Sequence, residues 1–237
     1  MKGNTQAFSS RLKPRAKHHT AITSRRIASM RVHLLRWYRS HGRSFIWRDD
    51  EASMYLRIVS EVLLQRTRAP VVDSMLSSFQ STFPSWKALG SARRAELEKV
   101  LRPLGLWRRR AATLIQLGRQ MPHRLRSLPR ERAELEAMPG VGQYVASAIL
   151  LFVHGKPEPL LDTNMARVLE RCFGRRRLAD IRHDPYLQDL ARRIVAGSDP
   201  IRINWAILDL GALVCTPRSP RCRDCPLRRQ CQFYRHR

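Results

Sequence analysis

The sequence predicts an all-α protein, and two observations lead to this fold class. Apolar residues recur at helical spacing in one stretch after another along the chain. Pro and Gly signals such as Pro84 and Pro103-Leu104-Gly105 separate these stretches, and none shows the apolar–polar alternation of a half-buried strand. Helices that each carry one apolar face must pack against other helices, so a protein built from helices alone is expected.

Residues 1–26 are basic and lack Asp and Glu, which predicts a disordered arm. Such an arm either follows DNA phosphates or serves only as a solubilising tail, and an organellar transit peptide has a similar composition. Helical spacing of apolar residues begins at Ile27 and continues to Tyr38, and His41-Gly42 ends this first helix.

The remaining helices are predicted from the same periodicity and from the breakers between them. In chain order they are Met54–Leu64, Val71–Phe83, Arg93–Leu101, Arg110–Met121, Glu131–Met138, Gln143–Val153, Asn164–Cys172, Tyr186–Val195 and Ile201–Leu213.

The charge balance indicates a polyanionic partner. The chain has 45 Lys and Arg against 19 Asp and Glu, a formal net charge of +26. Only six of the basic residues are lysine. Arginine forks onto phosphate and stacks on bases, which suits nucleic acid. The alternative is a chain that carries arginine on every solvated face without a specific partner.

The chain lacks the features of a membrane or secreted protein. Its longest apolar run, Val145–Val153, is interrupted by Ser147 and is too short for a bilayer. No apolar segment of a signal peptide follows the basic start. We therefore expect an intracellular monomer, located in the cytoplasm or nucleoid if the source is bacterial or archaeal.

Four of the five cysteines lie near the C-terminus as Cys215, Cys222, Cys225 and Cys231, with the spacing C-x6-C-x2-C-x5-C. In an intracellular protein this pattern predicts metal rather than disulfides. Four thiolates hold either a [4Fe–4S] cluster or one Zn²⁺. A zinc ribbon normally has two CxxC pairs and this pattern has one, so the spacing favours the cluster. Cys172 stands apart and is expected to be a buried core thiol.

A glycine-rich turn, Pro139-Gly140-Val141-Gly142, joins two predicted helices, and Gln143 opens the second. Gly140 and Gly142 permit positive φ and a close approach of the backbone. The free N–H groups and the dipole of the second helix can then hold a phosphate without a charged side chain. Taken alone, the turn is equally an ordinary helical hairpin without a ligand.

Two carboxylates stand at informative positions. Asp162 follows Leu160-Leu161 and opens a helix, either as a plain N-cap or as a carboxylate that faces a flipped nucleotide. A glycosidic bond breaks through an oxocarbenium-like state, which such a carboxylate stabilises. Glu61 lies inside an apolar helix, where a lone Glu must pair, stay protonated or act in catalysis. A structural pairing is the simpler interpretation of Glu61 by itself.

Together the motifs indicate a family. MPGVGQYVASAI at 138–149, LLDTNMARVLERC at 160–172 and the four-cysteine pattern follow one another as in the endonuclease III and mismatch-glycosylase superfamily of base-excision repair, the helix-hairpin-helix (HhH-GPD) proteins. The chain resembles this family from about Arg36 to Tyr234, most of its length.

The resemblance implies two helical domains. One is a six-helix barrel with the hairpin, over residues 50–156; the other, made of 27–49 and 157–237, ends in the [4Fe–4S] loop. Double-stranded DNA with a mismatched or damaged base would lie across the groove between them, with the target base flipped into a pocket.

The resemblance also implies roles for single residues. Asp162 falls on the catalytic aspartate of the family, and Glu61 falls on the pocket glutamate of its monofunctional mismatch branches. Tyr144 stands where the endonuclease III branch has the lysine that forms a Schiff base with the sugar. A tyrosine cannot form a Schiff base, so we expect a DNA glycosylase without lysine-based lyase activity, in which Tyr144 shapes the pocket.

A side chain must replace the contacts that the flipped base leaves behind. Arg66 matches the family position that enters the duplex. Trp107, on the short loop after Leu106, is the second candidate for this wedge. The alternative role for Trp107 is core packing.

The resemblance leaves two branches open, one that removes thymine or uracil opposite guanine and one that removes adenine opposite guanine or 8-oxoguanine. Residues 63–67 read LLQRT, close to the LLRRT of the thymine branch, whereas the adenine branch usually has Gln at 66 and 68. Residues 105–111 lack the Gly-Tyr-Tyr of the adenine branch, and Thr163 stands where that branch has Gly. The chain also stops soon after Cys231, without a domain that reads 8-oxoguanine. The sequence therefore favours the thymine/uracil branch.

Two non-enzyme classes remain as alternatives. A DNA-binding module with the same hairpin would need no acidic residue in the groove, so the presence of both Glu61 and Asp162 argues against it. A zinc-ribbon transcription factor would hold zinc in the four cysteines.

Overall fold

The computed structural model describes residues 22–122 and 127–236, and every regular element within these ranges is a helix. The predicted all-α class is therefore confirmed. The α-helices are α1 (Ser24–His41), α2 (Met54–Leu64), α3 (Ala69–Thr82), α4 (Trp86–Gly90), α5 (Arg94–Leu101), α6 (Trp107–Gln120), α7 (Arg132–Glu136), α8 (Gln143–Phe152), α9 (Thr163–Phe173), α10 (Pro185–Val195), α11 (Pro200–Leu213) and α12 (Gln232–Arg235). Short 3-10 turns are η1 (Ile46–Arg48), η2 (Arg102–Leu104), η4 (Cys222–Asp224) and η5 (Arg228–Gln230).

Capping residues set the helix starts. Thr23 accepts a hydrogen bond from the Arg26 backbone and begins α1 at Ser24, inside the segment that was predicted as an arm. Residues 1–21 of that arm lie outside the described residues. Asp184 and Asp199 cap α10 and α11 in the same way, each with a proline at the first helical position.

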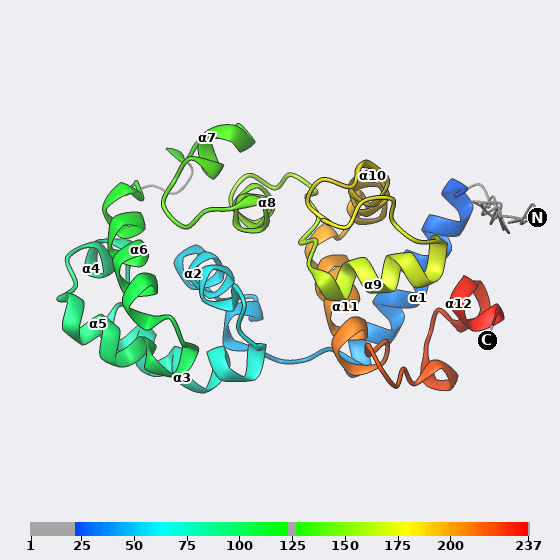
Figure 1. The fold of residues 1–237 in the computed structure, drawn as a ribbon, viewed down its shortest axis with the longest axis horizontal. Coiled ribbons are helices and arrows are strands. Elements are labelled where there is room, and N and C mark those ends of the chain that lie inside the picture. Colours follow the sequence, from blue (N-terminus) through cyan, green and yellow to red (C-terminus); the bar gives the residue numbers. More distant parts are fainter. Residues whose placement is uncertain (1–21, 123–126, 237) are drawn as a thin grey trace, which may run out of the picture.

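The helices bury two hydrophobic cores. The first is formed by η1 and α2–α8 and includes Trp47, Phe79 and Trp86. The second is formed by α1 and α8–α11, with Leu227 and Cys231 beyond them. Figure 1 shows the corresponding division, with α2–α7 on one side and α1 with α9–α12 on the other. Burial of apolar side chains in both cores is the main stabilisation of the fold.

Helix α8 belongs to both cores. Every residue from Val145 to Phe152 is buried; Val145, for example, packs in the first core and Leu151 in the second. This explains the longest apolar run of the sequence, because a helix that is surrounded by protein is apolar on all sides. None of the helices in the described part of the chain has the length and hydropathy that a membrane span requires.

Candidate functional site

The first part of the site is a buried pair at the junction of the two cores. Glu61, inside the largely apolar helix α2, is 2% exposed. Tyr144, near the start of α8, packs against both cores and donates its phenol hydrogen bond to Glu61 Oε2 at 3.0 Å. This pairing answers the requirement that a buried carboxyl group has a partner.

Burial decides the protonation of Glu61. Loss of solvent raises the pKa of Glu61 to about 7, while the Tyr144 hydrogen bond and the charge of Arg48 act in the opposite direction. The charge of Asp162 adds to the rise. Burial likewise raises the pKa of Tyr144 well above its usual value, so this phenol remains a proton donor to Glu61. Glu61 is therefore a carboxyl group that is able to give up or hold a proton near neutral pH.

The second part of the site is Asp162, which caps α9. Its carboxylate accepts hydrogen bonds of 2.7 Å from the Met165 backbone and from the Asn164 side chain. Burial raises the pKa of Asp162, and these hydrogen bonds together with the charge of Arg167 act against that rise. The helix N-terminus adds a further positive potential that favours the anion. Asp162 is thus the N-cap and also a carboxylate whose charge is supported from several sides.

Side chains of α9 connect Asp162 with the cysteine loop. Arg167 donates to Asn164 Oδ1 at 2.8 Å and to the Cys215 carbonyl at 2.7 Å. Asn164 in turn donates to Asp162, so two side chains, Asn164 and Arg167, link the carboxylate to the first cysteine of the loop. Their geometry fixes the direction of the Asp162 carboxylate relative to the loop.

A buried charge cluster lies within electrostatic reach of Glu61. Asp209, on α11, has no exposed surface and accepts hydrogen bonds from the backbone and guanidinium of Arg43 and from Arg48 Nη1. Arg48 bridges the two regions, because its charge also lowers the pKa of Glu61. Sequence reasoning missed this cluster, since an Asp inside an apolar helix and two arginines about 160 positions away share no local motif.

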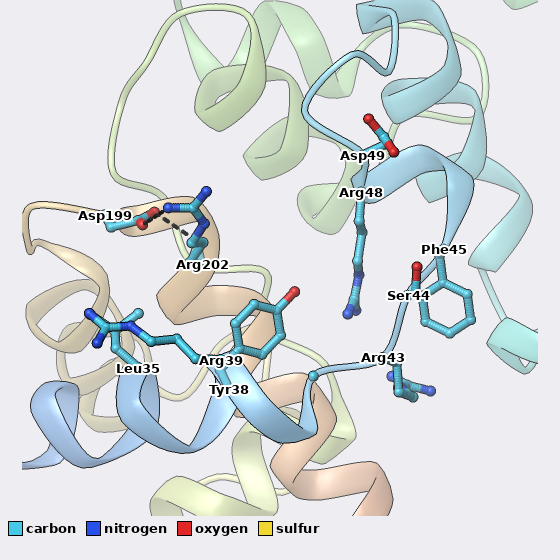
Figure 2. A pocket seen from close by; sticks show the side chains of 11 residues that line it. Leu35, Tyr38, Arg39, Arg43, Ser44, Phe45, Arg48, Asp49, Asp199 and Arg202 are labelled. Carbon is cyan, nitrogen blue, oxygen red and sulfur yellow. Dashed lines mark hydrogen bonds and ion pairs between the residues drawn. The ribbon is translucent and has the colours of Figure 1, made fainter.

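A cavity of about 470 Å³ lies where the end of α1, residues 42–49 and the start of α11 meet (Figure 2). Figure 2 shows Arg48 extending between Tyr38 and Phe45 into this space. Neither Glu61 nor Tyr144 nor Asp162 lines it, so this cavity is separate from the candidate catalytic residues.

The hairpin lies between α7 and α8. Gly140 has φ +74°, and a Cβ there would lie 2.5 Å from the Thr113 side chain of α6, so this position needs glycine. Gly142 does not use the positive φ that glycine permits, because its φ is −92°, and a Cβ there would meet no protein atom within 4 Å. Gly142 is the N-cap of α8 and leaves the first N–H groups of this helix without a side-chain cap. Val141 is buried and anchors the turn.

The other two hairpin residues, Pro139 and Gln143, are in contact with the rest of the protein. Pro139 is half-buried, and Gln143 donates to the Arg182 carbonyl of the loop between α9 and α10 at 3.3 Å. The hairpin therefore lies against α6 at Gly140 and is hydrogen-bonded at Gln143 to the loop between α9 and α10.

Two turns next to the hairpin expose residues with positive φ. Arg66 has φ 58° and is exposed; the neighbouring Gln65 side chain donates to the Gly140 carbonyl at 2.9 Å. Leu106 has φ 48° and is 64% exposed. Trp107 is half-buried against the first core, with the guanidinium groups of Arg102 and Arg108 over its ring. The side chain that protrudes at this loop is Leu106, which the sequence reasoning passed over although Gly105 marks the turn.

The four C-terminal cysteines line one small void. No three His, Cys, Asp or Glu side chains in residues 22–122 and 127–236 gather closely enough to hold a single metal ion. Arg171, from the last turn of α9, donates to Cys215 Sγ at 3.2 Å. Cys172 is 4% exposed in the second core, as predicted, and its thiol hydrogen-bonds with Cys231.

Comparisons with known proteins agree with this geometry. The family model "HhH-GPD superfamily base excision DNA repair protein" matches residues 59–184. A thymine-DNA glycosylase of Aeropyrum pernix is 39% identical, over 88% of this chain and 96% of the relative. A thymine/uracil-DNA glycosylase of Pyrobaculum aerophilum is 36% identical, over 86% of this chain and 91% of the relative. The solved structure of a thermostable thymine-DNA glycosylase superposes with a TM-score of 0.77 at 27% identity, covering 89% of this chain and 97% of that one.

The predicted family is thus confirmed by a model that spans the hairpin, Glu61 and Asp162. The chain belongs to the HhH-GPD superfamily of base excision DNA repair proteins.

Proposed function

We propose that this chain is a monofunctional DNA glycosylase that removes thymine or uracil opposite guanine. One observation carries the proposal: Glu61, a buried acid with a pKa of about 7, is hydrogen-bonded to Tyr144 and lies close enough to the buried carboxyl group of Asp162 for the two to interact electrostatically. Two carboxyl groups in such different environments suit two different roles in breaking a glycosidic bond.

The proposed reaction is hydrolysis. The bond between the base nitrogen and C1′ of the sugar breaks, water supplies hydroxide to C1′, and a proton goes to the departing base. Asp162 stabilises the sugar while it is cationic, so its effect belongs to the transition state. Glu61, in its protonated form, donates to the leaving base. Tyr144 holds Glu61 in place through its hydrogen bond and packs against both cores beside it.

The product is an intact strand with an abasic site. Tyr144 offers no amine for a Schiff base, and the six lysines include none at the hairpin. Borohydride added during turnover is expected to trap no covalent adduct, and the strand should break only after alkali. A trapped adduct in the parental protein would contradict the monofunctional mechanism.

The experiment that tests the proposed substrate is a panel of duplexes with G·T, G·U, A·G and A·8-oxoguanine pairs, each scored for base release in a single turnover. We expect release from G·T and G·U. Release from the adenine pairs alone would assign the chain to the adenine branch, and no release from any pair would favour a DNA-binding module.

DNA is proposed to lie across the seam of the two cores. The uncapped N-terminus of α8 at Gly142 offers backbone N–H groups to a phosphate, and Gln143 holds that helix start in place. Arg66 and Leu106 are exposed on neighbouring turns and are the proposed wedge residues, whereas Trp107 packs against the first core. A net charge of +26 predicts binding that weakens steeply with salt.

The four-cysteine loop is proposed to hold a [4Fe–4S] cluster. Four thiols line one void, and their spacing has one CxxC pair where a zinc ribbon normally has two, so the cysteines fit a [4Fe–4S] cluster better than one zinc ion. Four cysteine ligands leave no open iron position, so the cluster supplies a rigid support for the loop. Purified protein should be yellow-brown, and colourless protein that carries one zinc per chain would overturn this assignment.

A further inference from the structure

Two residues other than glycine have positive φ in the described part of the chain, and both are exposed at the tips of neighbouring turns: Arg66 and Leu106. A side chain in this region of backbone space costs about 1–2 kcal/mol. Such strain persists where the surroundings impose it, and it concentrates at functional positions.

A single side chain holds both turns. Arg110, on α6, donates from Nη2 to the Gln65 carbonyl at 2.7 Å and to Thr67 Oγ1 at 2.9 Å, on either side of Arg66. Its Nε donates to the Gly105 carbonyl at 3.0 Å, directly before Leu106. The guanidinium fork is planar and rigid, so it sets the distance between the two tips as well as their conformations.

We propose that Arg110 is a positioning residue that joins the two strained turns into one two-pronged wedge, so that Arg66 and Leu106 enter a duplex together. This inference rests on the proposed function. A wedge matters only where a base must be pulled from a stacked and paired duplex, and an unpaired base does not need it. A merely structural role for Arg110 would affect paired and unpaired substrates alike.

The test compares two DNA substrates with the same target strand. In one, uracil is paired opposite guanine in a duplex; in the other, the same uracil lies in an unpaired bubble. Single-turnover release at saturating enzyme is measured for the parental chain, for Arg110→Gln and for Arg109→Gln. Arg109 is an exposed neighbour on α6 and serves as the matched control for charge.

We expect Arg110→Gln to slow release from the duplex by about 10-fold or more, since a small misplacement of positioning groups has effects of this size. Release from the bubble should change little, and Arg109→Gln should match the parental chain on both substrates. Equal slowing on both substrates, or no slowing on the duplex, would overturn the proposal. If the parental chain released uracil from neither the duplex nor the bubble, the proposed function itself would be contradicted.

A second measurement covers the case in which Arg110→Gln folds poorly. Arg110→Lys keeps the cation but reaches fewer of the acceptors, which include the carbonyls of Gln65 and Gly105 and the Thr67 hydroxyl, so it should give an intermediate loss on the duplex alone. Arg66→Ala and Leu106→Ala should then each lower the rate of release from the duplex by a smaller factor in the Arg110→Lys background than in the parental chain. The reason is that the two turns are no longer held together, so loss of one side chain removes less of their joint effect. Strict additivity of these losses would contradict a joint wedge.

Discussion

The two carboxyl groups of the pocket come from opposite regions of the molecule, and their surroundings differ. Glu61 comes from the middle of α2 in the first core, where Tyr144 donates a hydrogen bond to its carboxyl group. Asp162 comes from the N-terminus of α9 at the second core, where Met165, Asn164 and the charge of Arg167 support the anion. Burial raises the pKa of both carboxyl groups, and more hydrogen bonds oppose that rise at Asp162 than at Glu61.

The comparison shows how two acidic residues of one site are placed in different local environments. A helix interior removes water and raises a pKa, whereas a helix start supplies N–H donors to a carboxylate. Residue type alone does not separate these roles, since both are acids. The substitutions below test whether the difference between Glu61 and Asp162 is functional.

Asp162→Asn should have the largest effect. Loss of the negative charge should lower the rate of base release by about 10³-fold, a size typical of a group that acts on transition-state charge. Asn can still cap α9, so thermal melting and duplex affinity should stay close to the parental values. Retention of full activity would reduce Asp162 to a helix cap.

Glu61→Gln should follow, with a loss of about 10²-fold or more in rate, as expected for removal of a general acid. The parental rate should fall as pH rises past about 7, where Glu61 loses its proton, and this fall should be absent from the Gln variant. A parental rate that instead rises through pH 7 would make Glu61 a base.

The same substitution should stabilise the fold at alkaline pH. Because the folded pKa of about 7 lies above the usual 4.5, the stability that Glu61 contributes is complete below pH 4.5 and is lost as pH rises through 7. Gln does not ionise, so Glu61→Gln should be more stable at pH 8 by up to about 3 kcal/mol. Urea unfolding at pH 4.5 and pH 8 measures this; an equal difference at both would contradict it.

Asn164→Ala should have a moderate effect. It removes one of the hydrogen bonds that orient Asp162 and breaks the link to Arg167, so the rate should fall about 10-fold. Asn164→Asp is the contrasting variant: a second carboxylate beside Asp162 should be at least as harmful. An unchanged rate in Asn164→Ala would show that the N-cap contact alone orients Asp162.

Tyr144→Phe should have the smallest effect. The phenol hydrogen bond lowers the pKa of Glu61, so its removal should move the alkaline fall of the rate to higher pH. Below pH 7, where Glu61 is already protonated, the rate should change only a few-fold. A pH–rate profile of this variant measures the shift, and a shift to lower pH would contradict the pairing.

Much of the fold was predictable because its helices are amphipathic and capped. The range Met54–Leu64 was predicted as it is found, since Ser53 caps it and its apolar positions are dense. The short helices α4 and α12 were not predicted, because a single turn carries no periodicity of its own.

The site was only partly predictable. Motifs identified Glu61, Asp162 and the cysteines, but their contacts depend on tertiary packing. Nothing local in the sequence brings Arg110 to two separate turns or Arg48 to Asp209. The exposure of Leu106 beside a packed Trp107 likewise depends on which of two adjacent side chains the core accepts.

The way in which the chain is divided between the two cores determines the order in which they can form during synthesis. The first core draws on one continuous stretch, from Phe45 to Leu150, and can collapse while translation continues. The second core needs α1, which leaves the ribosome first, and residues up to Cys231, which leave it last. Helix α1 must therefore wait, with its apolar face unpaired, until almost the whole chain has emerged. The two carboxyl groups, Glu61 of the first core and Asp162 at the second, are therefore fixed in position only after the chain has been synthesised as far as Cys231.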